Sequence, residues 1–197
     1  PLATAAKSSG HAFGIEPDLI TVAKGVTSAY VPLSACLVSA PVWDVIASGS
    51  EKYGVFSHGY TYSAHPLAAA AAMTNLDIIE RDHLTEQAKA RGDYLNALLH
   101  AEFDGHPLVA EIRGYGLLGA VEFAPPARPV AQFDPIGSFS GAVVARSREL
   151  GVITRALPSA DTVSFSPPFV VTEEEIDRMA HSVRQAVDDV AAGFEFA

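Results

Sequence analysis

The sequence is poor in cysteine, because Cys36 is the only one among 197 residues. A single cysteine cannot form a disulfide within the chain, and it does not supply a cysteine-based zinc site. The seven histidines are scattered without metal-ligand spacing. We therefore expect no metal site, and the reducing cytoplasm as the compartment.

Basic residues are also few. Lysine and arginine number 13 against 23 aspartates and glutamates, which gives a formal net charge of −10 and a sequence pI near 5.0. Nucleic acids and anionic membrane surfaces reward clustered positive charge. The composition therefore argues against both as partners and favours a small molecule or another protein chain.

Long apolar runs are missing as well. The longest, over 66–73, is mostly alanine and falls short of the roughly 18 residues of a membrane span. The opening residues, PLATAAKSSG, lack the apolar centre of a secretory signal. Because 49% of the residues are hydrophobic, the chain can still bury a substantial core, so we expect a globular protein without a membrane span.

The stretch DLITVAKG, Asp18 to Gly25, places one lysine directly after an apolar run. Residues 19–22 have the composition of a β-strand, and the run stops at Ala23 and Lys24. Such a strand delivers an amine to the edge of a sheet, where burial disfavours the ammonium form and leaves a nucleophilic amine. The hypothesis is a Schiff-base lysine. The alternative is a lysine that ends a strand and points into water.

The rest of the first half is expected to contain a buried strand, a short helix, a loop and two longer helices, over 33–38, 42–49, 53–65, 66–80 and 84–101. Gly49 is expected to close the short helix, and Pro66 suits the first turn of the next one. The loop, YGVFSHGYTYSAH, is rich in hydroxyls and aromatic rings, which makes it a candidate for a site.

The second half is expected to contain a hairpin, a helix and two short strands, over 109–123, 139–150, 152–157 and 162–166, before a last helix. Thr172 and Glu175 form a capping box at the start of that helix. Its apolar stripe consists of Ile176, Met179, Val183, Val187 and Val190. The pattern indicates an α/β first half and an α+β second half, with the boundary near residue 104.

Five segments, in order, resemble the C-terminal half of the class III (omega) aminotransferases. They are GIEPDLITVAKG, YVPLSACLVS, HGYTYSAHPLAAAAA, EIRGYGLLGAVEF and GVITRALPSADTVSFSPPFVVTEEEID, and together they cover nearly all of residues 10–180. The resemblance implies an α/β fold, the PLP-dependent transferase fold of type I. Residues 1–104 would be the C-terminal part of the large PLP-binding domain, and residues 105–197 the small C-terminal domain.

The resemblance also implies roles for residues around the lysine. Lys24 would form the internal aldimine with the aldehyde of pyridoxal 5′-phosphate and then, once released, move the proton at the substrate carbon. Thr61 would hold the cofactor phosphate across a dimer interface, on the neighbouring subunit, and Tyr60 would shape the same loop. The alternative for Thr61 is a turn residue.

Arg155 resembles the family arginine that grips a substrate carboxylate, which a guanidinium fork matches in bidentate fashion. Its alternative is an ordinary surface arginine between two short strands. Tyr30 is expected to line the substrate pocket. Arg113 is expected to be structural.

The implied function is transfer of an amino group between an amine or omega-amino acid and a keto acid such as pyruvate, by a homodimer with a shared active site. The family pattern also places an aspartate for the cofactor's pyridine nitrogen upstream of GIEPDL, and no aspartate precedes Asp18. Two alternatives therefore stay open. One is a catalytically incompetent fragment or remnant that acts as a dimerisation module, and the other is an aminomutase of the same fold type.

Overall fold

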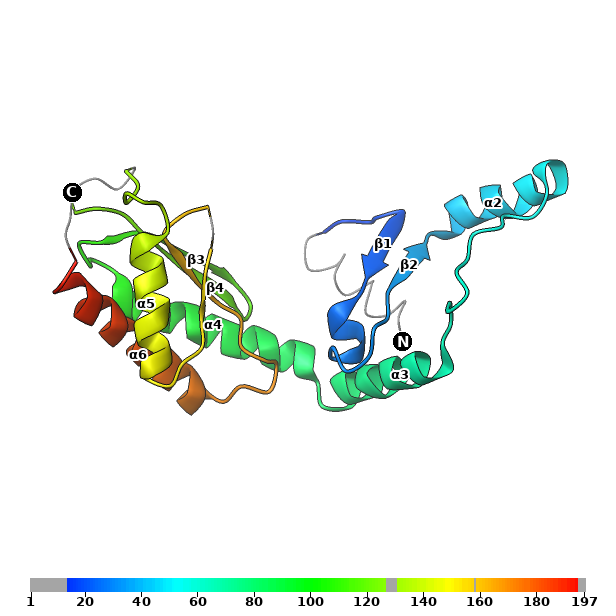
Figure 1. Ribbon diagram of the computed structural model, residues 1–197. Coiled ribbons are helices and arrows are strands. Elements are labelled where there is room, and N and C mark those ends of the chain that lie inside the picture. The colour runs from blue at the N-terminus through cyan, green and yellow to red at the C-terminus, as the bar shows by residue number, and fades with distance from the viewer. Residues whose placement is uncertain (1–13, 127–130, 158, 195–197) are drawn as a thin grey trace. The chain divides into compact units, whose positions relative to one another are not determined.

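The computed structural model describes residues 14–126, 131–157 and 159–194, and the chain divides into two compact units (Figure 1). Unit 1 is Pro1–Asp82 and unit 2 is His83–Ala197. Each unit has its own elements and is described by itself. In the described residues, no helix has both the length and the apolar character needed to cross a membrane.

Unit 1 is built around a two-stranded sheet. Strand β1 (Leu19–Val22) pairs antiparallel with β2 (Ala35–Val38) and leads through Ala23 into the short 3-10 helix η1 (Lys24–Thr27). Helices α2 (Ala40–Tyr53) and α3 (Pro66–Arg81) complete the unit, and α3 packs against η1. Both predicted strands are present, with β2 beginning two residues later than expected. The prediction that β2 is buried is wrong, because its residues alternate between half-buried and exposed.

Helix α2 does not end at Gly49, so that prediction is wrong. The helix continues to Tyr53 and ends at Gly54, whose φ of 89° takes the chain out of the helix while its N–H donates to Ser50 O. A glycine inside a helix costs about 1 kcal/mol relative to alanine but does not by itself stop the helix. The glycine that terminates it is the one with positive φ.

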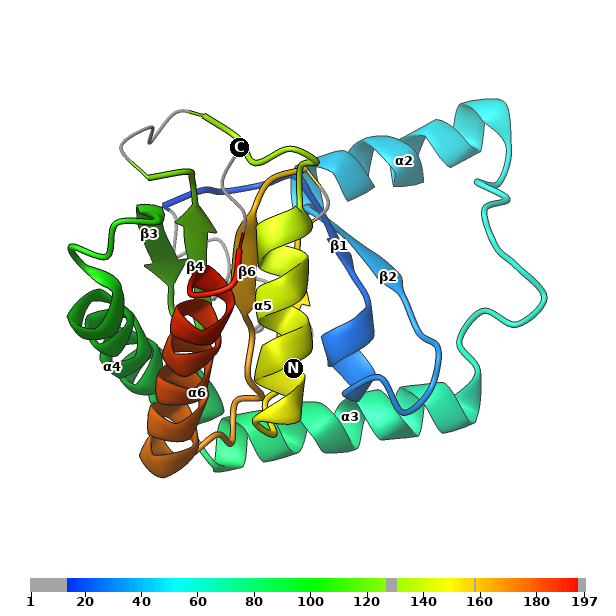
Figure 2. The ribbon, with the colours of Figure 1, turned by 60° about the vertical axis from the view of Figure 1, so that its left-hand side comes forward.

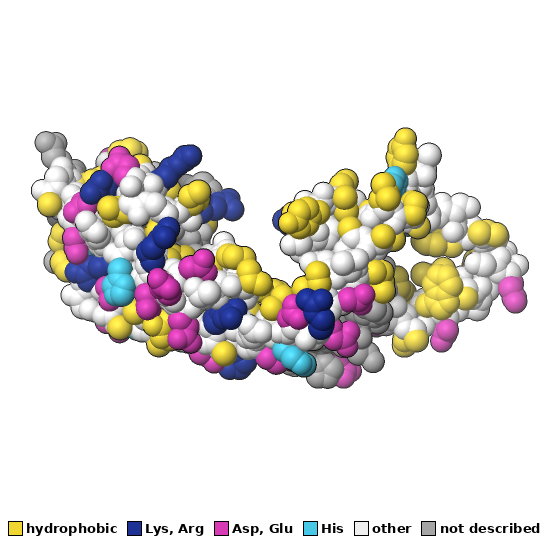
Figure 3. All heavy atoms as spheres, turned by 90° about the horizontal axis from the view of Figure 1, so that it is seen from below, with side chains coloured by type: hydrophobic (Ala, Val, Ile, Leu, Met, Phe, Trp, Pro, Cys, Tyr) yellow, Lys and Arg dark blue, Asp and Glu magenta, His cyan; other side chains and the backbone are white. Residues whose placement is uncertain are grey.

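Unit 1 has a small interior. The side chains of unit 1 that are buried among the described residues come from η1 and α3, and they are Thr27, Ala68, Ala72 and Leu76. Large apolar side chains stay exposed, including Trp43 and Phe56, and hydrophobic groups gather over this part of the surface in Figure 3. An apolar surface of this extent is typical of a contact with further polypeptide.

Unit 2 is a four-stranded antiparallel sheet with helices on one face (Figure 2). The strand order is β3 (Val109–Tyr115), β4 (Leu118–Phe123), β6 (Thr162–Phe165) and β5 (Arg155–Ala156). The helices are α4 (Leu84–Phe103), α5 (Ser138–Glu149) and α6 (Glu173–Ala191). The hairpin, the helices and β6 lie where the sequence predicts them, but the strand expected over 152–157 is reduced to the two residues of β5.

Alternation along the strands separates the two faces of this sheet. Val121 and Val163 point into a core shared with the helices, whereas their neighbours Ala120 and Ser164 point the other way. Helix α4 contributes Leu95, Leu99 and Phe103 to the same core. The contacts therefore assign α4 to unit 2, so the boundary between the units along the chain falls between Asp82 and His83. The sequence pattern instead predicts a domain boundary after residue 104, close to the end of α4.

Helix α6 begins with the predicted capping box. The backbone N–H of Glu175 donates to Thr172 Oγ1 (3.2 Å), and the backbone N–H of Thr172 donates to Glu175 Oε2 (2.8 Å). Glu175 Oε2 accepts from the backbone N–H of Thr172 and from its hydroxyl (3.1 Å), and these two hydrogen bonds lower the pKa of Glu175. Ile176, Val183 and Val187 of the predicted stripe are fully buried, so the apolar period locates the inner face of the helix.

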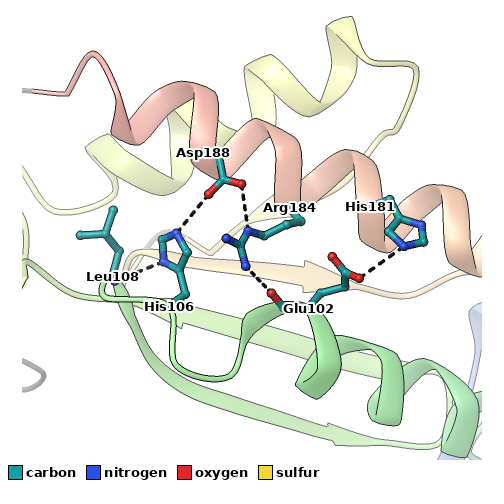
Figure 4. A network of polar contacts seen from close by, with 6 residues as sticks. All are labelled: Glu102, His106, Leu108, His181, Arg184 and Asp188. Carbon is teal, nitrogen blue, oxygen red and sulfur yellow. Dashed lines mark hydrogen bonds and ion pairs between the residues drawn. The ribbon is translucent and has the colours of Figure 1, made fainter.

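A polar network joins the end of α4 and the following turn to α6 (Figure 4). His106 Nδ1 accepts from the backbone N–H of Leu108 (3.2 Å), so Nε2 carries the proton and donates to Asp188 Oδ1 (3.3 Å). Arg184 donates to Asp188 Oδ2 (3.0 Å) and to the backbone carbonyl of Glu102. Burial, followed by the charge of Arg184, lowers the pKa of His106 against the opposing effect of Asp188.

Replacing His106 by glutamine should make the fold less sensitive to acid. Because the pKa of His106 is lower in the folded protein, the unfolded chain binds the proton first, and acidification favours unfolding. The loss begins as the pH falls through the ordinary histidine value of about 6.5 and is complete below the lowered folded pKa. Urea denaturation at a series of pH values measures the free energy of unfolding. The exposed His65→Gln control should keep the acid sensitivity of the wild type, and an equally steep decline in His106→Gln would contradict the role of His106.

Candidate active site

Lys24 sits on a backbone turn of unusual conformation. Lys24, Ser28 and Ala29 have φ angles of 49°, 50° and 61°, all in the left-handed region that glycine prefers. Each such residue costs about 1–3 kcal/mol and persists only where its surroundings fix it. Strain of this kind is found at active sites more often than elsewhere.

Hydrogen bonds from two directions fix this turn. The hydroxyl of Thr27, which is 2% exposed, donates to Val31 O (2.7 Å). From α3, Asn75 Nδ2 donates to the backbone carbonyls of Gly25 (2.9 Å) and Val26 (3.1 Å). The turn that carries Lys24 is therefore held both from within and from a helix that follows much later in the chain.

Lys24 opens onto a cleft of about 760 Å³. This volume lies within the usual range of small-molecule sites, about 300–1,000 Å³. Within the described residues, Lys24 Nζ has no hydrogen bond or ion pair, so the amine is available to a ligand. The lining consists of Ala23, Lys24, Ala29, Val31, Pro32, Leu33, Ser34, Tyr60, Tyr62, Ser63 and Ala64.

The loop between α2 and α3 supplies one wall of the cleft. Tyr60 lies in the lining and starts a turn in which its N–H donates to Ser63 Oγ (3.0 Å) and the N–H of Ser63 returns to Tyr60 O (2.9 Å). Thr61 is exposed in the same turn and does not line the cleft. Tyr30 is 88% exposed and also lies outside the lining. The structure thus brings Lys24 and Tyr60 together but not Thr61 or Tyr30.

Arg155 lies in unit 2, on the short edge strand β5. Arg155 pairs with Ser164 of β6, and Ser164 pairs with Ala120 of β4. Ala120 in turn pairs with Arg113 of β3. The four side chains therefore form a row across the sheet, on the face away from the helices. The hydroxyl of Ser164 donates to the backbone carbonyl of Arg155 (3.2 Å). This bond ties the backbone of the arginine to the neighbouring strand.

The two arginines of this row differ in their electrostatic partners. Arg113 Nη1 contacts Glu122 Oε2 (2.7 Å) and Glu111 Oε2 (2.9 Å), so its charge is already neutralised. The side chain of Arg155 is exposed and has no carboxylate partner within the described part of the chain. Arg155 is therefore the arginine of the row that is free to bind an external anion.

Arg155 borders a second cleft, of about 550 Å³, which lies wholly within unit 2. Thr154, Phe165 of β6 and Arg178 of α6 also line this cleft. Thr154 Oγ1 is buried and unpaired among the described residues. No group of three or more histidine, cysteine or acidic side chains in the described ranges is arranged to hold a metal.

The sequence does not reveal Asn75, Thr27 or Ser164 as parts of these sites. Asn75 is 50 residues from the carbonyl of Gly25 that it contacts, and its own segment reads as an alanine-rich helix. Ser164 is a single polar residue in a short strand, and its partner becomes evident only from the strand register. For Thr27 the sequence offers one weak indication of a role at the site, namely a hydroxyl side chain three positions after Lys24.

Sequence comparison decides the family. The pattern of the family described as "Aminotransferase class-III" matches residues 5–187. The chain belongs to the class III aminotransferases. An uncharacterized aminotransferase, y4uB, of Sinorhizobium fredii is 47% identical over 178 residues, covering 90% of this chain and 38% of that protein. The diaminobutyrate–2-oxoglutarate transaminase of Halomonas elongata is 42% identical and is covered to 40%, with 95% of this chain aligned.

Solved transaminases have the same fold. The omega transaminase from Pseudomonas jessenii in complex with PMP has a TM-score of 0.86 at 39% identity, over 93% of this chain and 40% of that one. This likeness confirms the predicted fold class, a partial α/β transferase fold of type I. This class III aminotransferase chain spans about 40% of the length of these relatives.

Replacing Thr27 by valine should destabilise the lysine turn. Valine has nearly the same shape but leaves the carbonyl of Val31 without its donor, at a cost of about 1–3 kcal/mol. Thermal denaturation of the whole protein measures the change. The Thr27→Ser control keeps the hydroxyl and should lose less; equal losses in the two variants would show that the hydroxyl is not what matters.

Proposed function

We propose that the protein is a PLP-dependent aminotransferase that moves an amino group between an amine or omega-amino acid and a keto acid such as pyruvate. The observation that carries the proposal is Lys24 on a strained turn, lining a cleft and without an ion pair among the described residues. Membership of the class III aminotransferases supports the reaction type. The named activities of the relatives, which include omega transamination, support the substrate class.

The residues at the cleft fit one side of the cofactor. Lys24 would hold pyridoxal phosphate through a covalent bond from Nζ to the aldehyde carbon, with loss of water. Tyr60 would form a wall beside it. When bound, the cofactor supplies an electron sink for the negative charge that develops at the substrate carbon. Among the described residues that line the cleft none is a carboxylate, so these residues would not supply a partner for the pyridine nitrogen.

Lys24 has a second role once the substrate amine has displaced it. Its free Nζ would act as the general base that takes the proton from the substrate carbon and holds it for return. Within the described residues no carboxylate is paired with Lys24 Nζ, so the amine is not held away from a substrate by an ion pair.

Arg155 would bind the substrate carboxylate. Its guanidinium is exposed, lacks an acidic partner in the described chain and belongs to a strand segment fixed by Ser164. The protein as a whole carries a formal charge of −10, so an arginine left unneutralised is a selective place for an anionic group. Tyr30 is proposed as a substrate-pocket residue on the resemblance alone.

Homodimerisation with a shared active site completes the proposal. Thr61 is exposed and does not line the cleft of its own Lys24, which agrees with a role at the phosphate of a neighbouring subunit's cofactor. The exposed apolar side chains of unit 1 supply area for such a contact. A remnant that only dimerises would have no need of a strained, unpaired lysine, so the enzyme is the favoured reading.

Replacing Lys24 should abolish covalent capture of the cofactor. The whole protein is mixed with pyridoxal phosphate, reduced with borohydride and digested, and the modified peptide is located by mass spectrometry. Wild type should carry the label on Lys24, whereas Lys24→Arg keeps the charge but should carry none. The exposed Lys52→Arg on α2 serves as the matched control and should label normally. Labelling that persists in Lys24→Arg would refute the proposal.

Replacing Arg155 by alanine should weaken keto-acid binding selectively. Loss of a charged hydrogen-bond pair is expected to raise KM for pyruvate about 10- to 100-fold, with little change for an amine that has no carboxylate. Steady-state kinetics with each substrate varied in turn separates the two effects. Arg148→Ala, an exposed arginine of α5, is the control for loss of charge. Unaltered pyruvate affinity in Arg155→Ala would remove this residue from the site.

A further inference from the structure

The lysine turn depends on a contact from α3 that lies far away in the sequence. Helix α3 packs against η1, and its buried side chains, Ala68, Ala72 and Leu76, lie on one side of the helix. Asn75 follows Ala72 by three residues, which places it on the same side of the helix. Its partly buried amide is therefore carried to η1 by a rigid element.

The hydrogen bonds define the orientation of this amide. Asn75 Nδ2 lies 2.9 Å from Gly25 O and 3.1 Å from Val26 O, the carbonyls of the two residues that follow Lys24. Both partners can only accept, so the nitrogen, with its two hydrogens, must be the atom that faces them. One side chain thus satisfies two successive carbonyls at the beginning of the turn.

The backbone hydrogen bonds of the turn join residues of the turn to one another. The N–H groups of Val26, Ser28, Ala29 and Tyr30 donate to Ala23 O (3.2 Å), Gly25 O (3.1 Å), Lys24 O (3.1 Å) and Thr27 O (3.1 Å). The two carbonyls that Asn75 contacts lie between the left-handed residues Lys24 and Ser28, so Asn75 ties this segment to α3. Without it, the carbonyls of Gly25 and Val26 lose their donor from α3, and the turn can shift relative to the helix.

We propose that Asn75 is a positioning residue that fixes the backbone turn carrying Lys24, and so sets where its amine stands. The inference rests on the proposed function, because it assigns the turn a reacting amine. Asn75 does not touch the reacting atoms and acts through the peptide groups of Gly25 and Val26. A displacement of about 1 Å at a reacting group is enough to slow a reaction about 100-fold.

The chemistry of the contact selects the test variants. Asn75→Asp has the same shape but presents oxygens to two carbonyl oxygens, so attraction becomes repulsion. Asn75→Ala removes the amide without adding charge. Thr74→Ala is the matched control, since Thr74 lies next to Asn75, is exposed, and bonds only to Ala70 O of its own helix (3.0 Å).

The first measurement is hydrogen exchange of the backbone in the whole protein, which needs neither cofactor nor activity. In Asn75→Asp and Asn75→Ala, the amides of Ser28, Ala29 and Tyr30 should exchange about tenfold faster, because each donates within the turn. Exchange in α6 should stay unchanged, and Thr74→Ala should match wild type throughout. Wild-type protection of the turn in both Asn75 variants would overturn the proposal.

The second measurement is the kinetic isotope effect with an amine deuterated at the reacting carbon. If Lys24 is displaced, proton transfer becomes more rate-limiting, so kcat should fall about 10- to 100-fold and the isotope effect should rise. A lower kcat with an unchanged isotope effect would overturn the positioning role. If Asn75→Asp does not fold, Asn75→Ala decides by the same criteria. Failure of wild type to capture the cofactor on Lys24 refutes the proposed function, whereas the exchange result still decides whether Asn75 holds the turn.

Discussion

The left-handed backbone at Lys24 is the constraint on which the organisation of unit 1 depends. Three residues of one short segment, Lys24, Ser28 and Ala29, occupy a conformation that costs free energy without glycine. Such a turn survives only if its peptide groups find partners, and Thr27 and α3 provide them. The sheet of β1 and β2 then determines where the turn begins and ends, because it pairs Val22 with Ala35 on either side.

Charge neutralisation distinguishes the arginines of unit 2 in a way that sequence position cannot. Arg113 and Arg155 lie in one row across the sheet, yet two glutamates neutralise the first and none contacts the second among the described residues. Exposed ion pairs contribute little to stability, about 0–1 kcal/mol each. Their importance here is electrostatic, because paired arginines no longer compete for an anion. An unpaired guanidinium in an acidic protein remains selective for a carboxylate.

Features with local causes were predictable from the sequence. Strand β1, the first-turn Pro66 and the capping box of Thr172 with Glu175 all follow from residues within a few positions of one another. One local prediction was wrong: Gly49 keeps a helical backbone and does not end α2. Other features were missed because their cause is distant in the sequence. The contact of Asn75 with the lysine turn spans 50 residues and leaves no periodic trace. The strand register that pairs Ser164 with Arg155 likewise cannot be predicted from the sequence, because it depends on how β5 and β6 align in the sheet.

The two units also differ in how they are stabilised. Unit 2 buries a continuous core of aromatic and branched side chains, including Phe103, Phe139 and Phe165, between one sheet face and three helices. Unit 1 buries small side chains of α3 and leaves Trp43 and Phe56 in contact with solvent. Since apolar burial is the main favourable term in folding, unit 1 has less to offset its conformational entropy. The strained lysine turn therefore lies in the unit with the smaller buried core, and covering the apolar surface of that unit by further polypeptide would stabilise its fold and the candidate site together.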